Sequence, residues 1–115
     1  MRLTQFSQGF ALSDAIGQHV ANRVQSALGT ASDQIDAVSI RMTDINAGRG
    51  GVDKRCRIVV GLRNARTVVV EAIHADLYAA IDDAAAAAKE AVWRHLKRRK
   101  TLRREYASRS RHLFA

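Results

Sequence analysis

The chain has 115 residues, 47% of them hydrophobic, and a formal net charge of +8 at pH 7. This length fits one domain with a modest two-layer core. No apolar stretch approaches the roughly 18 residues that span a bilayer, and residues 1–10 lack the apolar run of a secretory signal. The single cysteine, Cys56, excludes an internal disulfide, which fits a cytoplasmic protein.

The excess positive charge lies entirely at the C-terminal end of the chain. Residues 1–93 contain ten Lys and Arg and ten Asp and Glu, whereas residues 94–115 contain nine basic residues and one acidic residue, Glu105. A neutral body with one concentrated basic end indicates a polyanionic partner that is bound from that end. The alternative is a disordered basic tail that only keeps the protein in solution.

A short strand at residues 3–7 and an amphipathic helix open the chain. Ser13 is a candidate N-cap, and Gly29 is a candidate stop. Between them, apolar residues recur at a spacing of four, which predicts one buried helix face. This face consists of Ile16, Val20, Val24 and Leu28.

Three strands should follow, because apolar and polar residues alternate in residues 35–45, 55–63 and 67–73. The glycine-rich segment 46–54 is expected to form a flexible loop, and residues 63–66 a tight turn. The inward-facing side chains are predicted to be Val38, Ile40 and Met42, then Cys56, Ile58, Val60 and Leu62, then Val68, Val70 and Ala72.

The predicted fold is α+β, a single β-α-β-β-β-α domain over residues 1–104, with residues 105–115 as a flexible basic tail. Two helices cannot cover both faces of a four-stranded sheet. They should therefore pack on one face, as in double-stranded-RNA-binding domains, and leave the other face in water. That open face would bring together Arg41, Arg55 and Arg57.

The last helix is expected to pack at its start and to project at its end. Its apolar stripe is Leu77, Ile81, Ala84, Ala85, Ala88, Val92 and Leu96. Beyond Leu96 the stripe would be occupied by Arg99 and Arg103, which are too costly to bury unpaired, so the helix must leave the body. The projecting end carries Arg94, Lys97, Arg98, Arg99, Lys100, Arg103 and Arg104 around most of its circumference. Such an end fits a cleft in folded RNA, where phosphates approach from several sides.

Two stretches resemble a known family. "DLYAAIDDA", which begins at Asp76, resembles the signature of the ribosome hibernation promoting factor and ribosome-associated inhibitor family, also called sigma-factor modulation proteins. "LSDAIGQHV", which begins at Leu12, resembles that family's first helix. The family motif, with an expected structural role, maps to Asp76, Tyr78, Ala80, Ile81 and Asp82. The resemblance covers about residues 1–104 and is that of a short form without the additional dimerisation domain of long members.

The resemblance implies a cytoplasmic protein, expected to be a monomer, that binds the small ribosomal subunit and its ribosomal RNA. Under stress or in stationary phase it would occupy the channel for messenger and transfer RNA and silence translation. Arg94, Lys97, Arg98 and Lys100 would contact ribosomal RNA, supported by Arg41, Arg55 and Arg57. The alternatives are a general RNA-binding module and a stress-regulator interaction protein without ribosome specificity.

No enzyme is predicted. Asp82 and Asp83 are adjacent on a helix and do not face each other, so they are expected on a solvated face rather than as a catalytic pair. The histidines lack metal-ligand spacing, and neither a cofactor nor a small-molecule substrate is expected. Arg49 could contact RNA or simply lie in a hairpin connection. Tyr78 is expected to pack rather than stack on a base, and for Trp93 both roles stay open.

Overall fold

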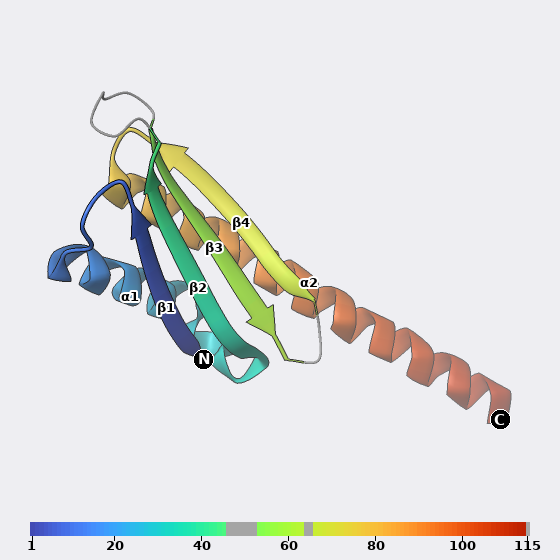
Figure 1. Ribbon diagram of the computed structural model, residues 1–115. Coiled ribbons are helices and arrows are strands. Elements are labelled where there is room, and N and C mark those ends of the chain that lie inside the picture. Colours follow the sequence, from blue (N-terminus) through green and yellow to red (C-terminus); the bar gives the residue numbers. More distant parts are fainter. Residues whose placement is uncertain (46–52, 64–65, 115) are drawn as a thin grey trace.

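The computed structural model describes residues 1–45, 53–63 and 66–114, except for the side chains of residues 99, 101–103 and 106–114. Its elements follow the predicted β-α-β-β-β-α order (Figure 1). In chain order they are β1 (Arg2–Gln8), α1 (Asp14–Leu28), the short 3₁₀ helix η1 (Gly29–Gln34), β2 (Ile35–Asp44), β3 (Lys54–Leu62), β4 (Thr67–His74) and α2 (Leu77–Phe114).

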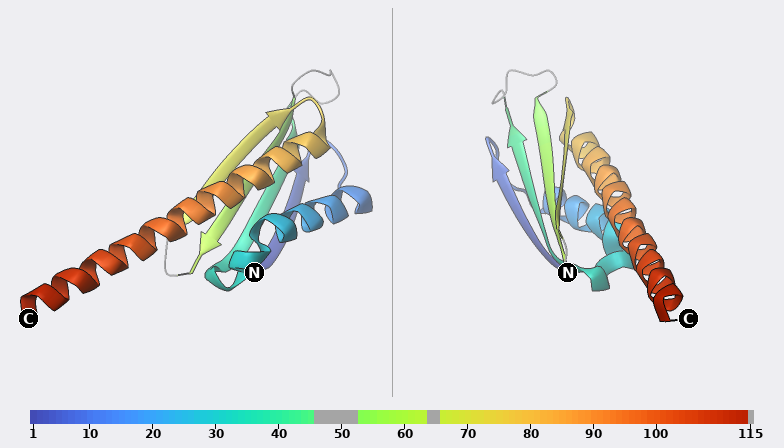
Figure 2. Two further views of the ribbon diagram at one scale, coloured as in Figure 1. Left: turned by 180° about the vertical axis from the view of Figure 1, so that it is seen from behind. Right: turned by 90° about the vertical axis from the view of Figure 1, so that its right-hand side faces the viewer.

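The four strands form one mixed sheet in the order β1-β2-β3-β4. β1 pairs with β2 in parallel, and β2, β3 and β4 pair antiparallel. A parallel pair requires a crossover connection, which α1 and η1 supply. Both helices lie on the same face of the sheet (Figure 2), so the α+β fold with two helices on one face is confirmed.

The core lies between this sheet face and the two helices. Alternation places Val38, Ile40 and Met42 of β2 and Cys56, Ile58 and Val60 of β3 inward, and each of these side chains is fully buried. The predicted stripe of α2 meets them with Ile81, Ala84, Ala85, Ala88 and Val92, while Leu77 and Leu96 are partly buried at its two ends. The alanines in this stripe let α2 approach the sheet closely.

Both helices begin at a side-chain cap, α1 at the predicted Ser13 and α2 at Asp76. The Ser13 hydroxyl accepts a hydrogen bond from the backbone N–H of Ile16 at 3.2 Å, and the Asp76 carboxylate accepts one from that of Tyr78 at 3.1 Å. α1 ends before Gly29 as predicted, but Gly29 has φ −59° rather than a left-handed conformation. The chain therefore continues into η1, a turn that the sequence pattern did not indicate.

Polar contacts join the two helices near the start of α2. His19 Nε2 lies 2.8 Å and Arg23 Nε 3.0 Å from Asp82 Oδ1. The Tyr78 ring meets the His19 ring edge to face, with centroids 4.8 Å apart. Tyr78 thus packs on α1 as predicted, although 39% of it stays exposed. The solvated position predicted for Asp82 was incomplete, since this carboxylate connects α1 to α2.

α2 extends beyond the body (Figure 1). It has 38 residues, and the molecule measures 67 × 23 × 18 Å along its principal axes. No glycine or proline interrupts the helix, so its sequence contains none of the usual causes of a kink. The helix thus continues straight past Leu96 and leaves the sheet, as the end of its apolar stripe predicts. Within the described part of the chain, no helix combines the length and apolarity needed to cross a membrane.

We expect Gly9→Ala to destabilise the protein by about 1–3 kcal/mol. Gly9 follows β1 with φ +89°, and a Cβ there would lie 3.0 Å from the Asp44 carbonyl oxygen. Gly17→Ala is the matched control: within α1 an added Cβ would meet only Gln5 Oε1, at 3.6 Å. Because alanine favours helices, this control should be neutral or stabilising by up to about 1 kcal/mol. Urea denaturation of both variants measures the difference, and equal free energies of unfolding would contradict it.

The buried thiol of Cys56 should make the free energy of unfolding fall as the pH rises in the alkaline range. Burial disfavours the thiolate and raises the pKa of Cys56 from 9.0 to about 12. Above the ordinary pKa the unfolded chain loses this proton while the folded chain keeps it, so stability falls as pH rises from about 9 to about 12. Urea midpoints measured across this window should fall less steeply for Cys56→Ala than for the natural sequence. Identical pH profiles would show that Cys56 does not contribute.

Candidate nucleic-acid interface

The first basic surface is the end of α2 that leaves the sheet. Arg94, Lys97, Arg98, Lys100 and Arg104 are all exposed there. Arg94 donates to the Glu90 carboxylate at 2.6 Å, one helical turn earlier, and both side chains are largely exposed. An exposed i,i+4 pair is worth only a few tenths of a kcal/mol. Arg94 can therefore exchange Glu90 for a phosphate at little cost.

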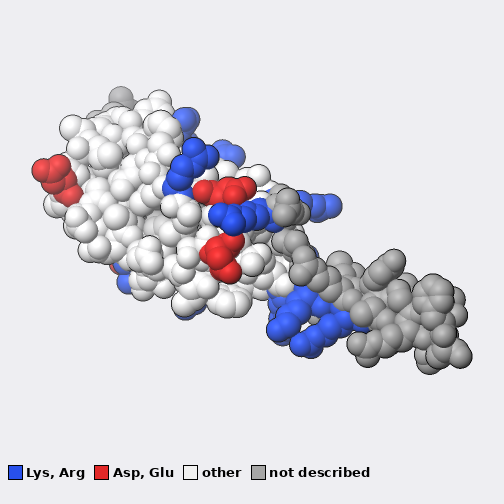
Figure 3. All heavy atoms as spheres, turned by 90° about the horizontal axis from the view of Figure 1, so that it is seen from below, with Lys and Arg blue, Asp and Glu red and all other residues white. Residues whose placement is uncertain are grey.

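Basic side chains gather at the base of this projecting segment. Seen from below, Lys and Arg gather where α2 leaves the body (Figure 3). We call the exposed side chains of Arg94, Lys97, Arg98, Lys100 and Arg104 the basic helix end. Arg66, directly before β4, is a further exposed basic residue of the body.

The second basic surface lies on the open face of the sheet. Arg41 of β2 is directly opposite Arg57 of β3, and Arg55 lies in the neighbouring row opposite Thr43. The predicted proximity of the three arginines is therefore correct. Arg55 Nη1 lies 3.8 Å from the Glu71 carboxylate, whereas Arg41 and Arg57 form no ion pair with any described residue. Two like charges held side by side favour a bound anion.

Phe6 adds an aromatic ring to this face. It is 46% exposed, and the Arg41 guanidinium lies 5.7 Å from its ring centroid. Along the sheet, Phe6, Arg41, Arg57 and Glu71 form one cross-strand row. Two hollows of about 230 and 150 Å³ lie between Arg41, Arg57 and their neighbours. They are too small for a folded partner, but they can admit a phosphate or the edge of a base.

The structure separates the predicted RNA contacts into two sets. The basic helix end lies on the helical side, at the end of the sheet where β2 begins and β3 ends. The sheet arginines lie on the opposite face, towards the end of β2 (Figures 1 and 2). One flat RNA surface cannot meet both. Arg49, and the side chains of Arg99 and Arg103, were also predicted contacts and lie outside the described residues.

The structure places three of the motif residues that were predicted to be structural at the start of α2 and in its contact with the core. They are Asp76, Ala80 and Ile81. Asp76 caps the helix, and Ala80 and Ile81 are fully buried. In the described residues, no group of three or more His, Cys, Asp and Glu side chains is placed to hold a metal ion.

A family model described as "Sigma 54 modulation protein / S30EA ribosomal protein" matches residues 5–100. The chain belongs to this family. S30EA-family proteins are associated with the ribosome, which agrees with the resemblance found at Asp76–Ala84. No curated protein sequence matches the chain significantly.

Two solved structures show the same S30EA fold. The N-terminal domain of Protein Y from Thermus thermophilus is 26% identical, with a TM-score of 0.68, and the match covers 83% of this chain and 99% of that one. A ribosomal subunit interface protein from Coxiella burnetii is 18% identical, with a TM-score of 0.73, and the match covers 84% of this chain and 99% of that one. The second similarity is one of fold alone.

Proposed function

We propose that this protein binds the small ribosomal subunit, occupies the channel for messenger and transfer RNA, and silences translation under stress or in stationary phase. The observation that carries the proposal is the basic helix end, which projects from a neutral body in a member of the S30EA family. A projecting helix with positive charge around it can enter a cleft lined by phosphates. The protein would act in the cytoplasm and without a cofactor.

The mechanism is occlusion rather than chemistry. The lysines and arginines of the basic helix end neutralise phosphates and release counterions, which makes binding strongly dependent on salt. The body behind them then fills the space that the substrates of translation would need. Arg41 and Arg57 support this by meeting a second RNA segment on the other side of the body. Specificity comes from the shape of the channel, because ribosomal RNA helices present few base edges.

Competition on small subunits tests the proposal. Purified subunits are incubated with the protein either empty or after binding messenger RNA and initiator transfer RNA, and are then sedimented at two salt concentrations. We expect co-sedimentation with empty subunits, and strongly reduced co-sedimentation with filled ones. Equal binding to both would refute occupancy of the channel while leaving ribosome association intact.

A duplex RNA of unrelated sequence serves as the control ligand. If it removes the protein from subunits at equimolar concentration, the protein is a general RNA-binding module. If the protein sediments with no subunit at any salt concentration, ribosome association fails, and an interaction with a protein regulator becomes the better hypothesis.

A further inference from the structure

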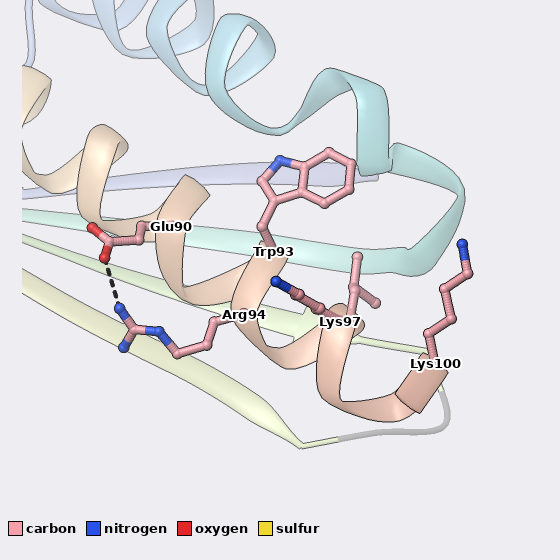
Figure 4. A pocket seen from close by; sticks show the side chains of 6 residues that line it. Glu90, Trp93, Arg94, Lys97 and Lys100 are labelled. Carbon is pink, nitrogen blue, oxygen red and sulfur yellow. Dashed lines mark hydrogen bonds and ion pairs between the residues drawn. The ribbon is translucent and has the colours of Figure 1, made fainter. Parts of the chain in front are cut away.

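An apolar hollow lies beside the basic helix end. It has a volume of about 510 Å³ and opens to solvent, and its lining is mainly apolar. The described residues that line it are Glu90, Trp93, Arg94, Leu96, Lys97 and Lys100 (Figure 4). This volume lies within the range of sites that bind small organic groups.

Trp93 is the aromatic residue among the described residues that line this hollow. It is 47% exposed, although it lies only one residue after fully buried Val92. Partly buried Leu96 lies one turn further along the same side of α2. Stability alone does not require a half-exposed tryptophan here, since the core stripe is complete without it. The indole therefore offers a flat, half-exposed aromatic surface on the outside of α2.

The rim of the hollow is cationic. Lys97 and Lys100 follow Trp93 at i+4 and i+7, which places all three on one side of the helix. Figure 4 shows Trp93 and Lys100 projecting from α2 to the same side, while Arg94 and Glu90 pair with each other on another side. An anionic group next to a planar apolar group would match this arrangement. A purely apolar partner would make no use of the cationic rim.

We propose that this hollow binds one unpaired nucleobase of an RNA strand. The base stacks on the Trp93 indole, and Lys97 and Lys100 contact the phosphates on either side of it. A base in a duplex cannot reach the indole, because both its faces are covered by neighbouring bases. The inference deepens the proposed function and rests on it for the identity of the RNA, but not for its chemistry.

Trp93 is the single tryptophan of the chain, so its fluorescence reports on this hollow alone. The full chain is titrated with an oligouridylate of about eight nucleotides, a length within the usual range of single-strand sites. An abasic oligomer of the same length keeps the phosphates and lacks the bases. We expect saturable quenching by oligouridylate, and little quenching together with weaker binding for the abasic oligomer.

Trp93→Leu should weaken binding of oligouridylate about tenfold, as the loss of one stacking contact does, while Trp93→Phe should keep most of the affinity. Val69→Thr is the matched control, since Val69 is a 50% exposed apolar residue on β4. It should leave binding unchanged. Circular dichroism checks that each variant is folded.

Equal affinity of the natural chain and Trp93→Leu, or equal quenching by both oligomers, would overturn the inference. Emission that changes with protein concentration in the absence of RNA would also overturn it, because the hollow would then bind a second copy of the chain. No ribosome is present in this assay. Its failure is therefore distinct from failure of the competition on small subunits.

Discussion

Replacing Arg94, Lys97, Arg98 and Lys100 together by glutamine should weaken binding to the small subunit by at least about a hundredfold. All four side chains are exposed at the basic helix end. Their removal deletes phosphate contacts without touching the core. The slope of log K against log salt concentration should become shallower by about three to four, close to one unit for each lost contact. Co-sedimentation with small subunits at several salt concentrations measures both quantities.

A pair of variants with equal charge change separates local contacts from net charge. Arg98→Gln with Lys100→Gln removes two charges from the basic helix end, whereas Arg2→Gln with Lys89→Gln removes two exposed charges elsewhere. Only the first pair should reduce the salt slope by about two. Equal effects of the two pairs would show that binding follows overall charge. Arg41→Gln with Arg57→Gln should have a smaller effect than the first pair, since these arginines have a supporting role.

Ala88→Asp should be the most damaging single substitution for stability. Ala88 is fully buried where α2 packs against the core, so a carboxylate there has neither water nor a cation. Burying the charged carboxylate, or protonating it so that it is buried as a neutral acid, costs about 3–5 kcal/mol. This is a large share of the free energy of unfolding of a typical domain, which is about 5–15 kcal/mol. The free energy of unfolding in urea measures this loss.

Ala86→Asp is the matched control, because residue 86 lies two positions away on the exposed side of the same helix. It introduces the same side chain with the same helix propensity and should cost less than about 1 kcal/mol. If both variants lose the same stability, the cost reflects helix propensity rather than burial. The packing of α2 described above would then be wrong.

Much of the fold could be predicted from the sequence, because its information is local. The alternation at Val38, Ile40 and Met42 shows which strand face is buried. The alanine-rich stripe of α2, followed by cations, shows where the helix leaves the body. Both signals depend only on the period of one element.

Other features depend on which elements meet, and local patterns do not carry this information. The parallel pairing of β1 with β2 is one example, and the joint contact of His19 and Arg23 with Asp82 is another. For the candidate site, the sequence predicted the basic residues of α2 and the proximity of the sheet arginines. It could not show that Phe6 lies beside Arg41 or that Trp93 borders a hollow.

The continuity of α2 has a consequence for the thermodynamics of binding. Its first half is fixed by packing on the sheet, and the same unbroken helix carries the basic residues outward. The helix therefore holds the cationic groups in place before binding. Most of the backbone entropy needed to align them is lost on folding rather than on association. A disordered basic tail of equal charge would lose that entropy only on contact with RNA. A pair of glycines inserted after Leu96 would make this end of α2 as flexible as such a tail without removing any charge.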